Sequence, residues 1–290
     1  MPSYLPFDPN PRTPQTKPPA LSCDSQFHVL GPREQYPVRT GAVYEMPSAT
    51  IAAALRMHRA LGIERGVIVQ PTTYGADHSA TLDGLAAAGP NYRACANAVV
   101  FNEKDDGYIA KLHSAGVRGA RFTRQGLGVA LGKAEFDRAV ARVRELGWYV
   151  KVQPEPDGIV ASIAAYENLA MPVVIDHLGR PDAARGVADL SVQKVAELLR
   201  KGNFWVMVSL AEKISKAGPP WDDVVPIVRL YLETAPDRII WGSDWPHPVS
   251  TKQPPNEADL LELLYRCAPG ESERRKILVD NPARLFGFES

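Results

Sequence analysis

The sequence lacks an excess of charge of either sign. Its 33 lysine and arginine residues are balanced by 33 aspartate and glutamate residues, so the formal net charge is zero. Proteins that bind nucleic acid or an anionic membrane surface need a positive field, because contacts with phosphate supply much of that affinity. We therefore expect neither nucleic acid nor a lipid surface as a partner.

Long apolar runs are absent as well. No run approaches the roughly 18 apolar residues that a membrane-spanning helix requires, and the N-terminus has no apolar core of the kind found in secretion signals. These absences predict a cytoplasmic protein that does not enter a membrane.

Cysteine is scarce. Cys23, Cys95 and Cys267 are odd in number, lie far apart in the chain and form no Cys-x-x-Cys pair. A disulfide framework or a zinc knuckle requires paired or closely spaced cysteines, so neither is indicated. We expect all three to be reduced and structural.

The composition is otherwise that of a globular protein, with 45% apolar and 23% charged residues. Residues 1–19 differ from the rest because they contain seven prolines, and proline disfavours regular helix and central strand. We interpret residues 1–19 as a proline-rich arm. Nothing resembling a linker interrupts residues 20–290, which we expect to form one domain.

Short runs of β-branched and apolar residues recur along this domain and predict strands. They cover residues 21–27, 66–70, 93–100, 117–122, 149–153, 172–176, 204–208 and 239–242. Their starts are about 31 residues apart on average, the length of a strand, a crossover helix and a return. Eight such units predict a barrel of parallel strands.

The segments between the strands carry helical spacing. Residues 53–61 and 136–146 are two examples, and each ends near a glycine, Gly62 or Gly147, that can stop a helix. A doubly wound sheet would carry a glycine-rich fingerprint after its first strand, and none follows Phe27. We therefore predict an α/β fold, a distorted (β/α)8 or TIM barrel, with a long loop at 33–44 and terminal helices within 257–290.

In such a barrel the reactive side chains lie where the strands end, because the eight βα loops build the site at that face. Polar residues do gather at the predicted strand ends. They are Gln26, His28, Gln70, Thr72, Thr73, Tyr74, Asn97, Arg121, Arg124, Gln153, Glu155, Asp176, His177, Arg180, Ser209, Lys213, Asp244 and His247.

Three stretches at these ends carry a resemblance. Residues 23–28 read Cys-Asp-Ser-Gln-Phe-His, residues 174–181 read Val-Ile-Asp-His-Leu-Gly-Arg-Pro, and residues 240–248 read Ile-Trp-Gly-Ser-Asp-Trp-Pro-His-Pro. Together they resemble the amidohydrolase superfamily, within it the branch of 2-pyrone-4,6-dicarboxylate lactonase, sulfomuconolactone hydrolase and galactarolactone isomerase. The resemblance covers nearly everything after residue 19.

One departure from the family pattern bears on metal binding. The first strand of the family ends His-x-His, and here Gln26 replaces the leading histidine. In metal-dependent relatives both histidines bind the metal together with the last-strand aspartate, a fourth-strand lysine or glutamate, and histidines of the fifth and sixth strands. This chain offers Arg121 on the fourth strand and Gln153 on the fifth, which are poor ligands or none. We therefore expect no metal and no other cofactor.

The resemblance and the residue types together suggest roles in opening a lactone. Asp244 is the expected general base, and His28, His177 and Gln26 would polarise the carbonyl and stabilise the oxyanion. Arg121 and Arg124 would bind an acidic substituent. The weaker candidates for substrate contact are Lys213, Tyr74, Gln153 and His247. The expected partner is therefore a small anionic lactone from aromatic or sugar-acid catabolism.

Competing interpretations remain open at this level. Gln26 is shared with the isomerase of this branch, in which an intramolecular hydroxyl replaces water, although that isomerase lacks the last-strand aspartate. A metal-dependent hydrolase or decarboxylase could use His28, His177 and Asp244 as ligands, and a barrel without turnover could bind ligand alone.

Several residues also have plainer interpretations. Arg124 and Lys213 could be solvated loop charges, and Arg180 and His247 could secure loops. Asp24 would brace the barrel, and Asp176 would orient a neighbour by a hydrogen bond. The sequence does not indicate an oligomeric state.

Overall fold

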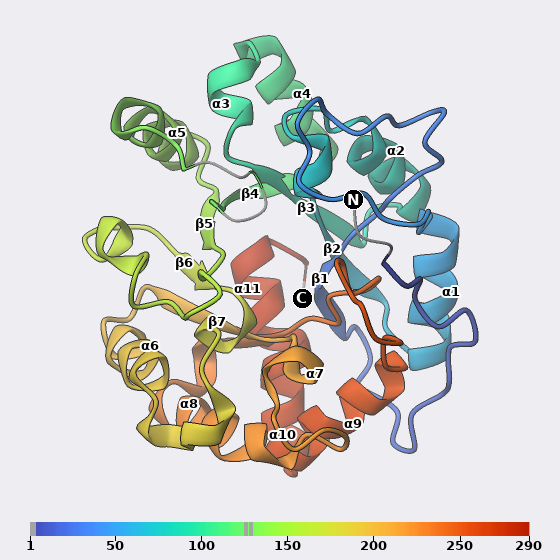
Figure 1. The fold of residues 1–290 in the computed structure, drawn as a ribbon, viewed down its shortest axis with the longest axis vertical. Coiled ribbons are helices and arrows are strands. Elements are labelled where there is room, and N and C mark those ends of the chain that lie inside the picture. The colour runs from blue at the N-terminus through green and yellow to red at the C-terminus, as the bar shows by residue number, and fades with distance from the viewer. Residues whose placement is uncertain (1–3, 125–126, 128–129, 290) are drawn as a thin grey trace.

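The computed structural model describes residues 4–124, 127 and 130–289. Eight parallel strands follow one another around a single sheet in chain order, with helices outside it, as Figure 1 shows. The strands are β1 (Cys23–Phe27), β2 (Arg65–Val69), β3 (Tyr92–Asn97), β4 (Val117–Phe122), β5 (Tyr149–Val152), β6 (Val173–Ile175), β7 (Phe204–Val208) and β8 (Ile239–Trp241). The predicted (β/α)8 barrel is confirmed.

The outer layer consists mainly of α-helices of four to thirteen residues. They are α1 (Ile51–Leu61), α2 (Ser79–Ala88), α3 (Val100–Glu103), α4 (Asp106–Ala115), α5 (Lys133–Glu145), α6 (Leu190–Arg200), α7 (Ala211–Ile214), α8 (Val225–Thr234), α9 (Glu257–Cys267), α10 (Glu271–Arg275) and α11 (Asn281–Phe286). Side chains of the predicted helical spacing, such as Met57 and Leu61 on α1, are buried against the strands.

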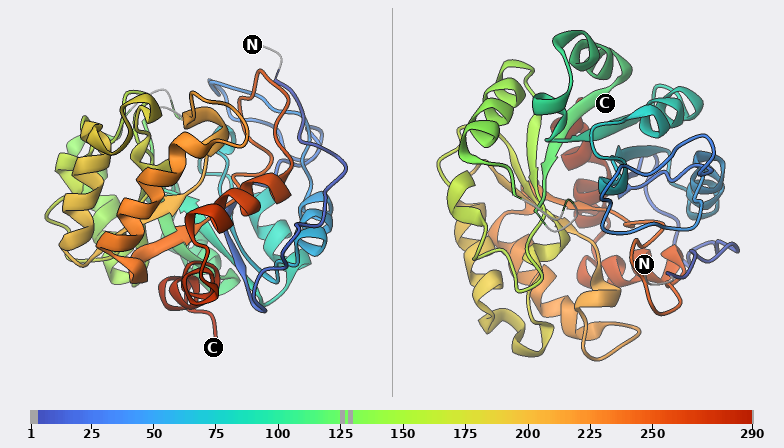
Figure 2. Two further views of the ribbon diagram at one scale, coloured as in Figure 1. Left: turned by 90° about the horizontal axis from the view of Figure 1, so that it is seen from below. Right: turned by 45° about the horizontal axis from the view of Figure 1, so that its top comes forward.

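The interior of the barrel is packed with side chains at the amino ends of the strands. Cys23, Tyr149 and Trp205, the first or second residues of β1, β5 and β7, belong to this inner cluster together with Phe286 of α11. Filling at this end leaves the carboxyl ends of the strands as the open face, where a TIM barrel carries its site. The chain termini lie at opposite ends of the barrel in the side view of Figure 2.

The barrel closes between β1 and β8 through the residues that follow the strands. Asp244 N–H donates to the Gln26 carbonyl at 2.9 Å, and His28 N–H donates to the Trp245 carbonyl at 2.8 Å. Within the described residues the two strands share a single bridge, Phe27 with Trp245, rather than a continuous ladder. The barrel is therefore nearly closed and irregular at this seam.

Two residues explain why the seam is tight. A Cβ at Gly242 would lie 2.8 Å from Gln26 Cβ and 2.9 Å from Gln26 N, so only glycine allows this approach. Asp24 accepts hydrogen bonds from Ser243 N at 2.9 Å and Ser243 Oγ at 2.5 Å, and His58 Nε2 lies 3.1 Å away. The expectation that Asp24 braces the barrel is confirmed.

The proline-rich arm runs along the barrel. Leu5 N–H donates to the Ser250 carbonyl at 2.9 Å, and the Phe7 and Trp245 rings lie 4.6 Å apart between centroids. Farther along, Arg12 N–H donates to Asn256 Oδ1 at 3.1 Å, at the start of α9. The arm therefore contacts the β8–α9 connection, beside the open face.

The structure corrects the expectation of a helix in every crossover. The connection between β5 and β6, residues 153–172, is fully described and contains one 3-10 turn, Ile163–Tyr166, instead of an α-helix. Pro154, Pro156 and Gly158 explain the difference, because both residue types oppose helix in this short segment. The outer layer is consequently thin beside β5.

Two further observations bear on the sequence predictions. Cys23, Cys95 and Cys267 are all buried, and none of the three forms a disulfide within the described part of the chain. Among the described helices, none is both long and apolar enough to cross a membrane.

Candidate active site

A pocket of about 290 Å³ opens at the carboxyl ends of the strands. Six of the predicted site residues line it, namely His28, Arg121, Gln153, His177, Lys213 and Asp244. The other described residues of its wall are Tyr4, Val43, Tyr44, Thr72, Arg180, Leu210, Pro248 and Val249. Strand ends that are far apart in sequence therefore converge on one cavity.

Asp244 lies at the floor of this pocket, just after β8, and is only 3% exposed. Gln26 Nε2 donates to Asp244 Oδ1 at 2.7 Å, and His28 Nε2 lies 3.4 Å from the same oxygen. The φ angle of Asp244 is 59°, a left-handed conformation that costs a non-glycine residue free energy. Gln26 thus supports Asp244 from behind instead of lining the pocket.

The environment of Asp244 favours the carboxylate form. Burial opposes ionisation, but the neighbouring His177 and His28, followed by Lys213, hold the pKa of Asp244 well below its usual range. A carboxylate with a lowered pKa is a proton acceptor across the neutral pH range. Asp244 is therefore ionised at neutral pH, and its contribution as a base depends on its position beside a bound water molecule rather than on a high basicity.

His28 is fixed by a backbone group. Its Nδ1 lies 2.7 Å from the Val69 carbonyl at the end of β2. A carbonyl only accepts hydrogen bonds, so Nδ1 carries a proton and Nε2 faces Asp244. A second proton, on Nε2, would let His28 donate to an oxygen in the pocket.

His177 has the opposite arrangement. Its Nε2 lies 3.3 Å from Arg121 Nη2, and its Nδ1 lies 2.9 Å from Ser209 Oγ. A guanidinium only donates, so Nε2 accepts and the ring is neutral. Burial, followed by the effect of Arg121, lowers the pKa of His177 to about 3 against the pull of Asp244 and Asp176. His177 therefore orients Arg121 and does not itself donate from Nε2, contrary to the role expected for it.

Arg121 belongs to a buried ion cluster. Its Nε and Nη2 lie 2.9 Å and 2.8 Å from Asp176 Oδ2, and Lys151 Nζ lies 2.7 Å from Asp176 Oδ1. Arg121 and Lys151 are also neighbours in the register of β4 and β5. Burial disfavours the carboxylate, but Lys151 and then Arg121 lower the pKa of Asp176. Two cations share one carboxylate in this cluster, so Asp176 alone does not neutralise Arg121.

Lys213 and Gln153 complete the wall. Lys213 Nζ donates to the Pro248 carbonyl at 2.7 Å, which joins the β7 and β8 connections. Gln153 Oε1 accepts from Thr123 Oγ1 at 2.6 Å. Both side chains are held at the margin of the pocket, where they can contact the outer part of a ligand.

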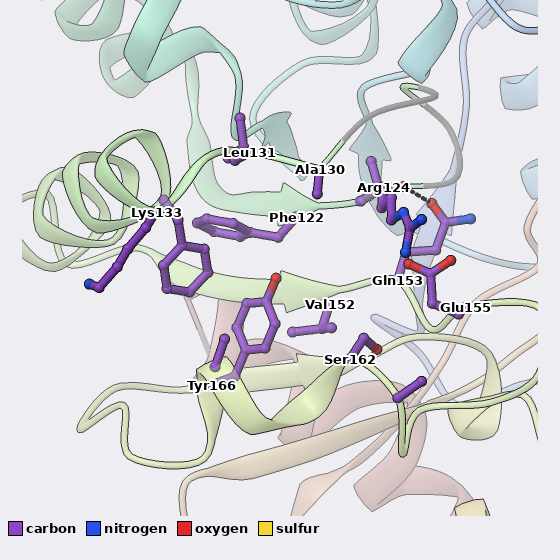
Figure 3. Close-up of a pocket in the computed structure, with 14 residues that line it drawn as sticks. Phe122, Arg124, Ala130, Leu131, Lys133, Val152, Gln153, Glu155, Ser162 and Tyr166 are labelled. Carbon is purple, nitrogen blue, oxygen red and sulfur yellow. Dashed lines mark hydrogen bonds between the residues drawn. The ribbon is translucent and has the colours of Figure 1, made fainter.

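Besides Gln26, three predicted site residues, Tyr74, Arg124 and His247, lie outside this pocket. Tyr74 is buried in the β2–α2 connection, where its hydroxyl accepts from Gly31 N–H at 3.2 Å. Arg124 lines an adjoining cavity, which it shares with Gln153 (Figure 3). Tyr74 and Arg124 therefore do not line the pocket that contains Asp244.

His247 is also elsewhere, between two carboxylates. Its Nδ1 lies 3.2 Å from Glu212 Oε1 and its Nε2 lies 3.1 Å from Glu257 Oε1. Burial would lower the pKa of His247, but the hydrogen bonds with Glu212 and Glu257 raise it to about 10. The resulting imidazolium links α7 to the start of α9, so it secures loops and does not touch a ligand.

Sequence reasoning missed several wall residues. Tyr4 comes from the arm and Tyr44 from the long loop before α1, and nothing in the local pattern of either segment indicates where it packs. The buried position of Lys151 could have been predicted from the sequence, because a lysine within the apolar run of β5 must bury its charge. Its buried partner, Asp176, follows the adjacent strand β6.

The donor set does not fit a metal ion. Within the described ranges, no group of three or more His, Cys, Asp or Glu side chains is arranged to hold one. His177 directs Nε2 at the Arg121 guanidinium 3.3 Å away, and a cation at that position opposes a second cation. Asp244 and His28 alone provide too few ligands for a closed site.

Comparison with known proteins gives consistent relatives. The chain is 38% identical to the 4-sulfomuconolactone hydrolase of Hydrogenophaga intermedia. The alignment covers 93% of this chain and 89% of that protein. It is 34% identical to the 2-pyrone-4,6-dicarboxylate hydrolase of Comamonas testosteroni, with 98% of this chain and 96% of that protein covered. The D-galactarolactone isomerase of Agrobacterium fabrum is 30% identical, with 96% of this chain and 93% of that protein covered.

The fold agrees with these relatives. A crystal structure from Agrobacterium tumefaciens superposes with a TM-score of 0.82 at 27% identity, covering 97% of this chain and 99% of that one. The family model described as amidohydrolase matches residues 23–288, which include all eight strands and the whole pocket floor. The chain therefore belongs to the amidohydrolase family.

Proposed function

We propose that this protein hydrolyses a small lactone that carries an acid group, and that it does so without a metal ion. The observation that carries the proposal is the buried Asp244 carboxylate, which faces His28 at 3.4 Å in a pocket that also holds the Arg121 guanidinium. Relatives named as lactone hydrolases support the reaction type.

The reaction begins with a water molecule bound at Asp244. The carboxylate accepts a proton as the water oxygen forms a bond to the lactone carbonyl carbon, and the carbonyl oxygen becomes an oxyanion. Gln26 holds Asp244 in position by its bond of 2.7 Å to Oδ1. Burial excludes bulk water that would compete for the carboxylate.

Arg121 and His28 would stabilise the oxyanion. The bonds to Asp176 and His177 use Nε and Nη2 of Arg121, and a guanidinium has further N–H donors on Nη1 for a substrate oxygen. Fixed donors in a buried site stabilise developing charge more than water does. An ester is also easier to cleave than an amide, so a metal is not required.

Collapse of the oxyanion completes the hydrolysis. The bond between the carbonyl carbon and the ring oxygen breaks, and Asp244 returns its proton to that oxygen. The products are a hydroxyl or enol and, on the same chain, a carboxylic acid that releases its proton to solvent and leaves as the carboxylate. Lys213 and Arg180, which line the pocket, would bind the acid substituent of the substrate.

Assays in oxygen-18 water test this proposal. A panel of acid-bearing muconolactones, pyrones and aldarolactones should include substrates that are opened with one labelled oxygen in the new carboxylate. A lactone isomerase is the second candidate, supported by Gln26 and by the isomerase relative. An unlabelled rearranged lactone would favour it, and no turnover of any panel member would contradict both.

Metal removal is expected to leave activity unchanged. We propose metal independence because Arg121 lies where a ligand set would need another donor. Activity after dialysis against a chelator should stay within about twofold of the untreated enzyme, and added zinc or manganese should not raise it. Loss on chelation followed by recovery with stoichiometric metal would contradict this.

No acidic limb from Asp244 is expected in the pH–rate profile between roughly pH 5 and pH 8. The pKa of Asp244 is lowered, so the base stays deprotonated as the pH falls through this range. His247, with its pKa raised to about 10, keeps its charge over the same range. The measurement is kcat/KM against pH with one lactone, and an acidic limb with its midpoint near about 6.5 would contradict Asp244 as the base.

We further propose a catabolic role in the cytoplasm. Three buried cysteines that form no disulfide among the described residues agree with a reducing compartment.

A further inference from the structure

A second cavity of about 460 Å³ lies beside the first pocket, between the β4–α5 and β5–β6 connections (Figure 3). It occupies the part of the outer layer where an α-helix would normally cover β5 and where this chain has only the 3-10 turn Ile163–Tyr166. Its volume is within the range of roughly 300–1,000 Å³ that is typical of ligand sites. The thin outer layer thus leaves room for a molecule.

The inner wall of the second cavity is aromatic. Phe122 and Phe136 have ring centroids 5.4 Å apart, and Tyr166 lies 5.8 Å from Phe122 and 5.3 Å from Phe136. The three rings meet edge to face, which fixes their orientation. In Figure 3 the Phe122 and Tyr166 rings, with Val152 beside them, border the same space. Such a wall binds apolar and especially flat groups.

The polar groups are confined to the rim. Arg124 is exposed beside Gln153, and Lys133 Nζ is paired with Asp137 Oδ2 at 2.6 Å. Glu155 contributes a carboxylate to the same cavity. The rim cations Arg124 and Lys133 are offset by the carboxylates of Glu155 and Asp137, so the cavity favours an uncharged occupant.

Gln153 connects the two cavities. It lines both of them, and its Oε1 accepts from Thr123 Oγ1 at 2.6 Å, so one hydrogen-bonded side chain forms the boundary. Gln153 is therefore the side chain that a ligand reaching from one cavity into the other would contact.

We propose that the second cavity is an accessory subsite for an uncharged aryl or alkyl arm of the lactone substrate. This inference rests on the proposed function and narrows it, because it assigns the chain to lactones that carry an apolar arm as well as an acid group. The acid group and the ester stay in the first pocket, and the arm packs on the aromatic wall.

Two tryptophan variants on one 3-10 turn test the subsite. Ala165 lines the cavity, whereas the adjacent Ala164 is exposed and does not line it. The substrates are a carboxylated γ-lactone with a phenylethyl arm and the same lactone without it. We expect Ala165→Trp to lower kcat/KM for the armed lactone by about tenfold or more, and to change the compact lactone by less than about twofold. Ala164→Trp should change neither.

A binding measurement separates failure of the subsite from failure of the proposed function. Calorimetry with 4-phenylbutyrate, which cannot be hydrolysed, should show binding to the wild type and to Ala164→Trp, with at least about tenfold weaker binding to Ala165→Trp. Ser162→Leu, a smaller filling of the same cavity, should act in the same direction and guards against misfolding of the tryptophan variant.

The outcomes are distinct. Absence of turnover with every lactone, together with this pattern of binding, would overturn the lactonase and keep the subsite. Failure of the wild type to bind 4-phenylbutyrate, or equal losses for armed and compact lactones in Ala165→Trp, would overturn the subsite.

Discussion

Asp244→Asn is expected to lower kcat by about 10³–10⁴-fold while the protein stays folded. The amide keeps the size of the side chain and an oxygen that can accept from Gln26 Nε2, which donates to Oδ1 at 2.7 Å. It cannot take a proton from water at neutral pH, so the attacking nucleophile is no longer activated. Single-turnover rates with a lactone that the wild type opens provide the measurement.

Two controls make this result interpretable. Asp237→Asn removes an exposed carboxylate that is paired with Lys276 just before the amino end of β8, at the opposite end of the strand from the pocket, and should leave kcat unchanged. Circular dichroism should show the same helix content in both variants. If Asp244→Asn keeps more than about a tenth of the wild-type rate, Asp244 is not the general base.

Asp176→Ala is expected to lower the free energy of unfolding by about 3–5 kcal/mol. The change removes the anion that lies 2.7 Å from Lys151 Nζ and 2.8 Å from Arg121 Nη2, and leaves two buried cations without it. Removing one partner of a buried ion pair is more damaging than replacing the whole group, because the remaining charge stays desolvated. Urea unfolding followed by fluorescence gives the value.

The exposed pair Lys133–Asp137 supplies the comparison. Asp137→Ala should change the unfolding free energy by no more than about 0.5 kcal/mol, since a solvent-exposed i,i+4 pair contributes little. Adding Lys151→Met to Asp176→Ala should restore part of the loss, because one unpaired charge is then gone. A loss below about 1 kcal/mol for Asp176→Ala would contradict the assigned cluster.

The barrel itself was predictable from local patterns. Strand runs and helical spacing repeat at the length of a βα unit, and the structure reproduces residues 117–122 and 204–208 as β4 and β7. The rule that sites gather at strand ends then brought His28, His177 and Asp244 into one pocket. These inferences depend on features that lie within a few residues of one another.

What could not be predicted depends on tertiary packing. Tyr4 reaches the pocket because the arm is held at Ser250 and Trp245, and neither contact has a signature in residues 1–19. His247 lies in a family-like motif, but its direction is decided by Glu212 and Glu257 on other segments. Hydrogen-bond partners also decided that His177 accepts from Arg121, which residue type alone leaves open.

The irregular closure between β1 and β8 has a consequence for how the enzyme would fail. Two backbone hydrogen bonds join the ends of β1 and β8, from Asp244 N–H to the Gln26 carbonyl and from His28 N–H to the Trp245 carbonyl. The donors of both bonds are residues whose side chains would take part in the reaction. A small separation of the ends of β1 and β8 would move Asp244 away from His28 while the outer helices remain folded. Denaturant should therefore abolish activity at a lower concentration than it unfolds the helices. Enzyme activity would then be the most sensitive measure of whether the barrel is closed.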